Sequence, residues 1–269
     1  MVFRHVDLCS GIGGFALGFE WAELSSPVLF CDIEPWSRKI LAKHWPDVPI
    51  AEDVKELAND PNGLIPDCDI LTAGYPCQPF SVAGQRKGQE DDRHIWPYIR
   101  KIVAQKRPAW CVFENVYGHI SLGLDEVLSD LEVEGYAART FIVPACATDA
   151  PHRRDRLWII AKNVADTNSA GLQMGQEARN TKGQRKGRDK QPQRCADLPR
   201  AAWPPEPPVG RVANGIPRRV DRLRGLGNAI VPQIAMRIGQ TIKAVHDIPA
   251  QGYAHNNVNK EKEDDNAKN

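Results

Sequence analysis

The sequence has no apolar run of the length, about 18 residues, that a helix needs to cross a membrane. Its first residues, from Met1 to His5, lead directly into an expected strand, so we also expect no signal peptide. Both absences favour a protein of the cytoplasm that does not bind membranes. The 269 residues are enough for one large domain, or for one domain that carries an insertion.

Pairs of cysteines in a CxxC pattern are also absent. The seven cysteines form an odd set, at positions 9, 31, 68, 77, 111, 146 and 195. This count and spacing argue against a disulfide framework and against a zinc site. We therefore expect reduced thiols and no bound metal.

Charge of one sign is not in excess overall, because 35 Lys and Arg residues balance 34 Asp and Glu residues. The average conceals an asymmetry, since 17 of the basic residues but only 7 of the acidic ones lie between Ala150 and Arg224. A basic segment on an otherwise acidic chain is a candidate surface for binding a polyanion. A solvated basic linker would have the same composition.

Short apolar runs alternate with segments of helical periodicity along the first part of the chain. This alternation predicts an α/β fold with a doubly wound, mostly parallel sheet. We expect strands near residues 6–9, 28–31, 70–73, 110–113, 136–143 and 157–161, and a short third strand with its exit loop within residues 50–54. Helices are expected near residues 15–22, 35–45, 94–105 and 122–134.

The pattern changes after Lys162. Residues 163–208 are rich in Gln, Arg, Lys, Gly, Asn and Pro and have no apolar period, so we expect a loop-like, partly disordered region. A helix is expected to end near Val245. We divide the chain into a catalytic and cofactor-binding domain (1–162), a short variable region (163–219), a C-terminal helix that returns to the domain (220–246) and a disordered tail (247–269).

A thiol lies at the exit of the fourth expected strand. Cys77 follows residues 70–73 within a loop that is too rich in Gly, Pro, Gln and Ser to continue the strand. Ligands bind at the carboxyl ends of strands in open α/β sheets, so a side chain here would face a substrate. Polar and basic residues after the thiol suit a flap over a polyanion: Gln78, Ser81, Gln85, Arg86 and Lys87. An inert core cysteine remains the alternative.

The first strand leads into a glycine turn that lacks the GxGxxG spacing of a dinucleotide site. Glycines at the start of a helix let a ligand approach the backbone. Asp32 ends the second strand, where an acidic residue can bind ribose hydroxyls, and Asp53 follows the third. The glycine turn and the two acidic residues together favour an adenosine-containing cofactor. A tight turn followed by two surface acids would give the same sequence pattern.

Glu114 ends the fifth expected strand and would lie beside Cys77 if the fourth and fifth strands are neighbours. A thiol that attacks an electron-poor ring and an acid that protonates it form a coherent pair. Arg154 and Arg156 precede the last strand, where alternation would point both side chains to one face, suited to a carbonyl or phosphate group. A helix cap and a solvated strand face are the alternatives.

In combination these motifs resemble those of the DNA (cytosine-5) methyltransferases. The matching stretches are residues 7–15 (DLCSGIGGF), 74–81 (GYPCQPFS), 114–116 (ENV), 152–156 (HRRDR) and 227–232 (GNAIVP). The likeness covers about residues 4–162 and 220–243. The Pro-Cys-Gln loop and the Glu-Asn-Val triplet are specific together, whereas the glycine turn alone is not.

The resemblance implies a reaction and a role for each matching residue. Cys77 would add to C6 of a cytosine flipped out of double-stranded DNA, and Glu114 would protonate N3. Arg156 would hold O2, and Arg154 would support the catalytic loop or the substrate backbone. S-adenosylmethionine would be the cofactor, held by Cys9, Ser10, Gly11, Ile12, Gly13, Gly14, Asp32, Ile33, Asp53, Val54 and Asn228.

The chain departs from the family pattern at several points. Family members commonly have Phe at the position of Cys9 and often Trp at that of Ile33, and the variable region is short for a target-recognition domain. We expect a monomer. A companion restriction endonuclease is a candidate partner, and a methyltransferase encoded without one is the alternative. The alternatives are an RNA (tRNA) cytosine methyltransferase, a catalytically silent DNA-binding homologue, and an oxidoreductase, which the glycine spacing disfavours.

Overall fold

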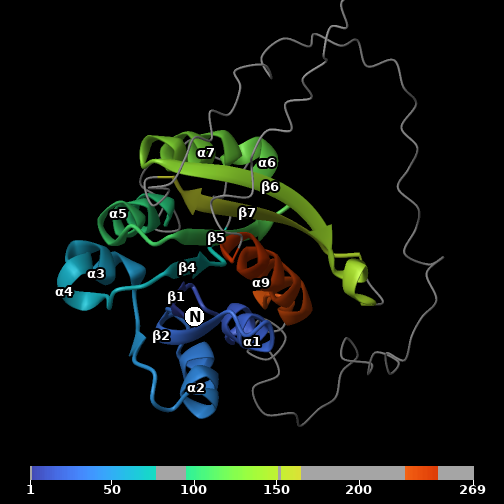
Figure 1. Ribbon diagram of the computed structural model, residues 1–269. Helices are drawn as coiled ribbons and strands as arrows, with labels where there is room; N and C mark the ends of the chain where they lie inside the picture. The colour runs from blue at the N-terminus through green and yellow to red at the C-terminus, as the bar shows by residue number, and fades with distance from the viewer. Residues whose placement is uncertain (1, 77–94, 151–152, 165–227, 248–269) are drawn as a thin grey trace, which may run out of the picture.

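The computed structural model describes residues 2–76, 95–150, 153–164 and 228–247. Figure 1 shows a central sheet with helices on both faces. The seven strands lie in the order β3-β2-β1-β4-β5-β7-β6. Their bounds are β1 Phe3–Leu8, β2 Ser25–Cys31, β3 Ile50–Ala51, β4 Ile70–Ala73, β5 Trp110–Val116, β6 Tyr136–Pro144 and β7 Asp155–Asn163.

Four neighbouring pairs of strands are parallel, from β3 through β2, β1 and β4 to β5. Strand β7 runs antiparallel to both β5 and β6, so the sheet ends in an antiparallel edge. The expected α/β fold with a mostly parallel sheet is confirmed. Strand β4 occupies the predicted residues 70–73 and is buried along its whole length, as a central parallel strand should be.

The helices form a layer on each side of the sheet (Figure 1). One face packs against α1 and α9, and the other against α3, α5 and α7, each through its own apolar core. The bounds are α1 Gly14–Trp21, α2 Pro35–His44, α3 Val54–Asn59, α4 Pro61–Leu64, α5 Trp96–Lys106, α6 His119–Leu122, α7 Leu124–Val133, the 3-10 helix η1 Ala145–Thr148 and α9 Pro232–His246. Short helices α3, α4 and α6 were not predicted.

Helix α9, far from α1 in the sequence, lies directly against it. A Cβ atom at Gly18 of α1 would come within 2.4 Å of the Pro232 carbonyl oxygen, and one at Gly239 would lie 3.0 Å from the Ala22 Cβ atom. The absence of side chains at these two glycines lets the helices approach closely. Through this packing the chain returns residues 228–231 to the glycine turn.

Several predicted residues lie outside the described part of the chain. They are Cys77, Gln78, Ser81, Gln85, Arg86 and Lys87, together with almost all of 163–219 and of the tail. Among the described residues, no helix has both the length and the apolar character needed to span a membrane, and no three His, Cys, Asp or Glu side chains group as a metal site. Cys9, Cys31, Cys68 and Cys111 are free thiols, whereas Cys146 is disulfide-bonded, so the expectation of reduced thiols is wrong for Cys146.

A polar network lies inside the sheet, under α1. Thr72 donates a hydrogen bond to Asp7 Oδ1 at 2.5 Å, and the Thr72 hydroxyl is 2.7 Å from His5 Nε2. All three side chains are fully buried, and no described group bonds to Asp7 Oδ2. Burial raises the pKa of Asp7 from 3.8 to about 8, so this carboxyl is largely protonated in the folded protein at neutral pH.

Asp7 should therefore make stability depend on pH. Because its pKa is higher in the folded protein than in the unfolded chain, its stabilising contribution is complete below about pH 4 and is lost as the pH rises towards 8. We expect the Asp7→Asn variant to gain stability relative to the wild type by on the order of 3 kcal/mol between about pH 5 and about pH 8. Urea unfolding at both pH values measures this difference.

Asp69→Asn is the matched control. Hydrogen bonding to Arg4 lowers the pKa of Asp69, so its titration is complete well below pH 5 and its difference from the wild type should stay constant over the same range. A constant difference for Asp7→Asn as well would contradict the buried, protonated carboxyl.

Candidate active site

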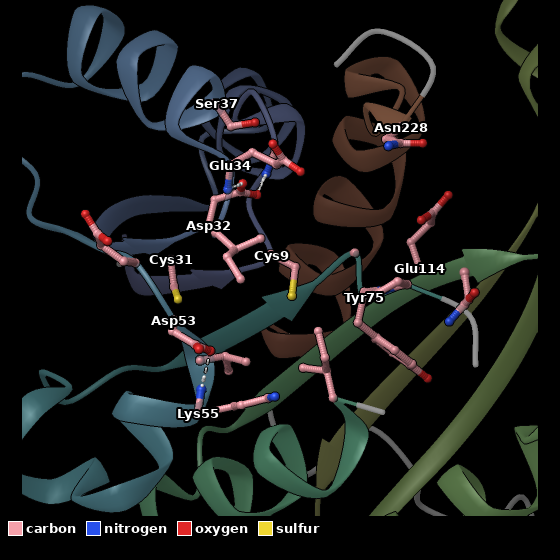
Figure 2. Close-up of a pocket in the computed structure, with 18 of the residues that line it drawn as sticks. Cys9, Cys31, Asp32, Glu34, Ser37, Asp53, Lys55, Tyr75, Glu114 and Asn228 are labelled. Atoms are coloured by element: carbon pink, nitrogen blue, oxygen red, sulfur yellow. Dashed lines mark hydrogen bonds between the residues drawn. The ribbon is translucent and has the colours of Figure 1, made fainter. Parts of the chain in front are cut away.

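A cavity of about 690 Å³ opens at the carboxyl ends of the parallel strands, where ligands bind in open α/β sheets. Figure 2 shows Cys9 between two groups of side chains, with Asp32, Glu34, Asp53 and Lys55 on one side and Glu114 and Asn228 on the other. The predicted site residues that line the cavity are Cys9, Gly11, Asp32, Ile33, Asp53, Val54, Glu114, Arg156 and Asn228.

The first group is organised by the Asp32 carboxylate. Its Oδ2 atom accepts a hydrogen bond from the Gly11 N–H at 2.7 Å, and its Oδ1 atom accepts one from the Glu34 N–H at 2.9 Å. Asp32 is only 9% exposed, and burial raises its pKa although both hydrogen bonds oppose the change. The carboxylate thus joins the turn after β1 to the exit of β2.

Two glycines of the turn serve packing. At Gly13, which has a φ of 84°, a Cβ atom would lie 2.5 Å from the Trp45 ring, and at Gly14 it would lie 2.7 Å from the Ile230 Cβ atom. Neither residue lines the cavity, and nor do Ser10 and Ile12. By contrast, a Cβ at Gly11, where φ is 56°, would have no atom within 4 Å, so the open face of the turn is at Gly11.

The far end of this group comes from the short segment after β3. Asp53 caps α3 by accepting a hydrogen bond from the Lys55 N–H at 2.9 Å, and Val54 beside it is buried. Ile33, which also lines the cavity, is 69% exposed. Two carboxylates and two aliphatic side chains therefore line this end, with polar and apolar surface for one ligand.

The second group centres on Glu114, within β5. Its Oε1 atom forms an ion pair of 2.9 Å with Arg156 Nε from the neighbouring antiparallel strand β7. Burial raises the pKa of Glu114 from 4.5 to about 7, and the nearby Arg156 and Arg154 only partly offset this effect. A carboxyl with this pKa can hold or release a proton near neutral pH, as a general acid requires.

Arg154, in contrast to Arg156, is not among the residues that line the cavity. Strand alternation does not apply, because Arg154 precedes β7 and has a φ of 38°. Its guanidinium donates a hydrogen bond to the Ala229 carbonyl at 2.7 Å, which ties the start of β7 to the segment that carries Asn228. Burial and the nearby Arg156 lower the pKa of Arg154, so the two arginines are close together although they do not share a strand face.

Strands β4 and β5 are neighbours, as expected, with Ala73 opposite Phe113. A Cβ atom at Gly74 would lie 3.8 Å from Glu114 Oε2, so the exit of β4 meets the carboxyl directly. Pro76 lines the cavity, and Cys77 is the next residue, outside the described part. Its place opposite Glu114 stays a prediction.

Sequence reasoning missed several residues that line the cavity. They are Cys31, Glu34, Trp36, Ser37, Glu52, Lys55, Gly74, Tyr75, Pro76, Ile95, Asn115 and Val116. Most lie within a few residues of a strand end. That position was a usable signal, although it does not distinguish a lining side chain from a buried neighbour.

A family model for the C-5 cytosine-specific DNA methylases matches residues 3–204, three quarters of the chain. The chain belongs to the C-5 cytosine-specific DNA methylase family. The family match includes both groups of cavity residues except Asn228.

The chain matches only part of the length of the individual family members to which it is similar. The Type II methyltransferase M2.BsuMI of Bacillus subtilis is 32% identical in a match of 175 residues, and the match covers 61% of this chain and 43% of that protein. The Type II methyltransferase M.NgoBV of Neisseria gonorrhoeae is 33% identical in a match of 173 residues, and the match covers 58% of this chain and 40% of that protein. The matched region thus spans about two fifths of these relatives.

Solved structures agree on the fold. A DNMT2 mutant from Spodoptera frugiperda has a TM-score of 0.52 at 20% identity, and Dnmt2 methyltransferase from S. pombe has a TM-score of 0.50 at 23% identity. Each match covers 60% of this chain and 50% of the other. At these identities the likeness concerns the fold alone, which is the Rossmann-like fold of the methylase family.

The pair formed by Glu114 and Arg156 can be tested without any substrate. Arg156 favours the charged form of Glu114, so the Arg156→Met variant should raise the pKa of Glu114 further above its wild-type value of about 7. Infrared difference spectra across a pH titration would follow the carboxyl band, which the Glu114→Gln variant assigns.

Arg153→Met provides the control, because Arg153 pairs with Asp155 at 2.8 Å and its side chain is largely exposed. This variant should leave the titration of Glu114 unchanged. An unchanged titration in Arg156→Met would show that the ion pair does not control the proton affinity of Glu114.

Proposed function

We propose that this protein is a DNA cytosine C5 methyltransferase that uses S-adenosylmethionine and forms a covalent adduct through Cys77. The observation that carries the proposal is Glu114, a buried acid with a pKa of about 7 on the wall of a ligand-sized cavity. The β4 exit that leads to Cys77 meets this carboxyl. Membership of the methylase family supports the same reaction.

The described residues fit S-adenosylmethionine. Asp32 suits the ribose hydroxyls, Asp53 and the aliphatic side chains of Ile33 and Val54 suit the adenine, and the open face at Gly11 admits a ligand close to the backbone. Asn228 would close the same cavity from the start of the last segment. The cofactor, when bound, supplies an electrophilic methyl group for C5 of cytosine.

The chain's own residues make C5 reactive. The Cys77 thiolate forms a bond to C6 while Glu114 gives its proton to N3, so no negative charge accumulates on the ring. Arg156 orients Glu114 and contacts O2. After C5 is methylated, a base removes the C5 proton, the S–C6 bond breaks, N3 returns its proton, and Cys77 leaves as a thiolate.

The target base has to leave the duplex to reach a cavity at the strand ends, at a cost of roughly a few kcal/mol. We assign DNA contacts to Gln78, Ser81, Gln85, Arg86 and Lys87 and to the basic stretch after Ala150. The division into a catalytic domain (1–162 with 220–246), a DNA-contacting variable region (163–219) and a tail (247–269) is part of the proposal.

The assignment of partners follows from the relatives, which are named Type II methyltransferases. We propose double-stranded DNA as the substrate and a restriction endonuclease of the same specificity as the companion activity. A single flipped base needs one active site, so we propose that the protein acts as a monomer.

The nucleophile is tested by replacing Cys77 with Ser. The weaker nucleophile should abolish methyl transfer and covalent trapping on duplex DNA that contains 5-fluorocytosine, because fluorine cannot be removed as a proton and keeps an active thiol attached. Denaturing gel electrophoresis detects the adduct.

Cys68→Ala is the control, since Cys68 is a free, buried thiol just before β4, away from the strand ends that form the cavity. It should still form the adduct. If Cys77→Ser formed the adduct as fast as the wild type, a different nucleophile would be required.

The acid role of Glu114 predicts a distinct pH dependence. Below about pH 7 the wild type holds the proton that the reaction uses, and Glu114→Gln does not, so the wild type should react roughly 10²–10⁴-fold faster. Above that pH the advantage should shrink roughly tenfold per pH unit as Glu114 ionises. The ratio of single-turnover rates cancels the titration of Cys77, and a ratio independent of pH from about 6 to about 9 would contradict this role.

A further inference from the structure

The exit of β4 and the segment after β5 are joined by a hydrogen bond that the proposed reaction does not use. The hydroxyl of Tyr75 lies 3.1 Å from His119 Nε2. Tyr75 is two residues before Cys77, and His119 begins α6, five residues after Glu114. The bond therefore connects the two chain segments that carry the proposed nucleophile and the proposed acid.

Both side chains are held rigidly. Tyr75 is 4% exposed and His119 is 1% exposed. The Tyr75 ring contacts the rings of Trp96, Phe113 and His119 at centroid distances of 5.6, 6.3 and 5.6 Å, and Trp96 donates a hydrogen bond to Asp130 at 2.8 Å. Aromatic packing fills the space around Tyr75, so a phenylalanine would fit there without the hydroxyl.

His119 is equally confined. A Cβ atom at Gly123 would lie 3.1 Å from the imidazole ring, so the backbone of the α6–α7 junction packs against it. Burial lowers the pKa of His119 below 6.5, so the ring is neutral at neutral pH and can share one proton with the Tyr75 hydroxyl. A neutral, fixed partner makes a hydrogen bond of defined length and direction.

The bond lies where small displacements would matter. Gly74, adjacent to Tyr75, is the position at which the β4 exit meets the Glu114 carboxyl, at 3.8 Å from a Cβ to Oε2. Figure 2 shows Tyr75 and Glu114 at the same end of the cavity, away from Asp32 and Asp53. A movement of about 1 Å between reacting groups can cost about 10²-fold in rate.

We propose that Tyr75 and His119 are positioning residues whose hydrogen bond fixes the segment bearing Cys77 relative to Glu114 and thereby sets the rate of thiol addition to cytosine. The inference rests on the proposed function and extends it. The hydrogen bond takes no part in the bond-making and bond-breaking steps of the proposed reaction. Loss of it should slow adduct formation while leaving cofactor binding at Asp32 and Asp53 unchanged.

The test compares three variants of the full chain. Tyr75→Phe removes only the hydroxyl, and His119→Gln keeps a hydrogen-bonding group near the position of Nε2. Tyr136→Phe is the matched control, because Tyr136 is also buried and its hydroxyl donates to the Pro108 carbonyl at 2.8 Å, at the opposite end of β5. For each we would measure the rate of covalent trapping on 5-fluorocytosine duplex DNA, the dissociation constant for S-adenosylmethionine and the urea midpoint.

We expect Tyr75→Phe to trap roughly tenfold more slowly than the wild type with unchanged cofactor affinity. The His119→Gln variant should keep most of the wild-type trapping rate, because the glutamine side chain can still form a hydrogen bond with the Tyr75 hydroxyl. Tyr136→Phe should lower the urea midpoint about as much as Tyr75→Phe does, because each variant loses one buried hydrogen bond, and it should keep the wild-type trapping rate. This combination separates positioning from a general loss of stability.

Two results would overturn the positioning role while leaving the methyltransferase intact. One is a wild-type trapping rate in Tyr75→Phe, and the other is an equal loss of rate in Tyr75→Phe and Tyr136→Phe. If the wild type itself formed no adduct, the proposed function would fail, and the positioning role would fail with it.

Discussion

The buried carboxyl of Glu114 is the group on which the account of this site depends. Burial disfavours the ionised form of a carboxyl group, whereas a neighbouring arginine favours it. The pKa of Glu114 is therefore set by the balance between its burial and its ion pair with Arg156. The order of the sheet produces that balance, because β5 lies between parallel β4 and antiparallel β7. One neighbour leads to Cys77 and the other supplies Arg156.

The other half of the cavity follows from β1 and β2. Their exits are joined by the Asp32 carboxylate, and α9 packs on α1 through Gly18 so that Asn228 reaches the same cavity. A continuous cavity thus links polar groups suited to a nucleoside with a proton donor suited to a ring nitrogen. In a methylase the two substrates have to meet in this way, because the methyl group passes directly between them.

Much of the fold could be predicted from local patterns. The apolar run at 70–73 and the Pro35 helix start appear as expected, because buried parallel strands and helix first turns have strong local signals. Strand direction has no such signal, which is why the antiparallel course of β7 was not foreseen. The position of Arg154 was not foreseen because this residue lies before β7 rather than within it. Helices as short as α4 and α6 have too few residues to display a period. Within the site, the glycine motif did not reveal that Gly13 and Gly14 make room for Trp45 and Ile230, since those partners are distant in sequence.

The most direct test of the central claim is mass spectrometry of nucleosides from duplex DNA incubated with the full chain and methyl-labelled S-adenosylmethionine, with tRNA in a parallel reaction. The account predicts labelled 5-methyldeoxycytidine in the DNA. Label confined to tRNA, label on a position other than C5, or no labelled nucleoside at all would contradict it.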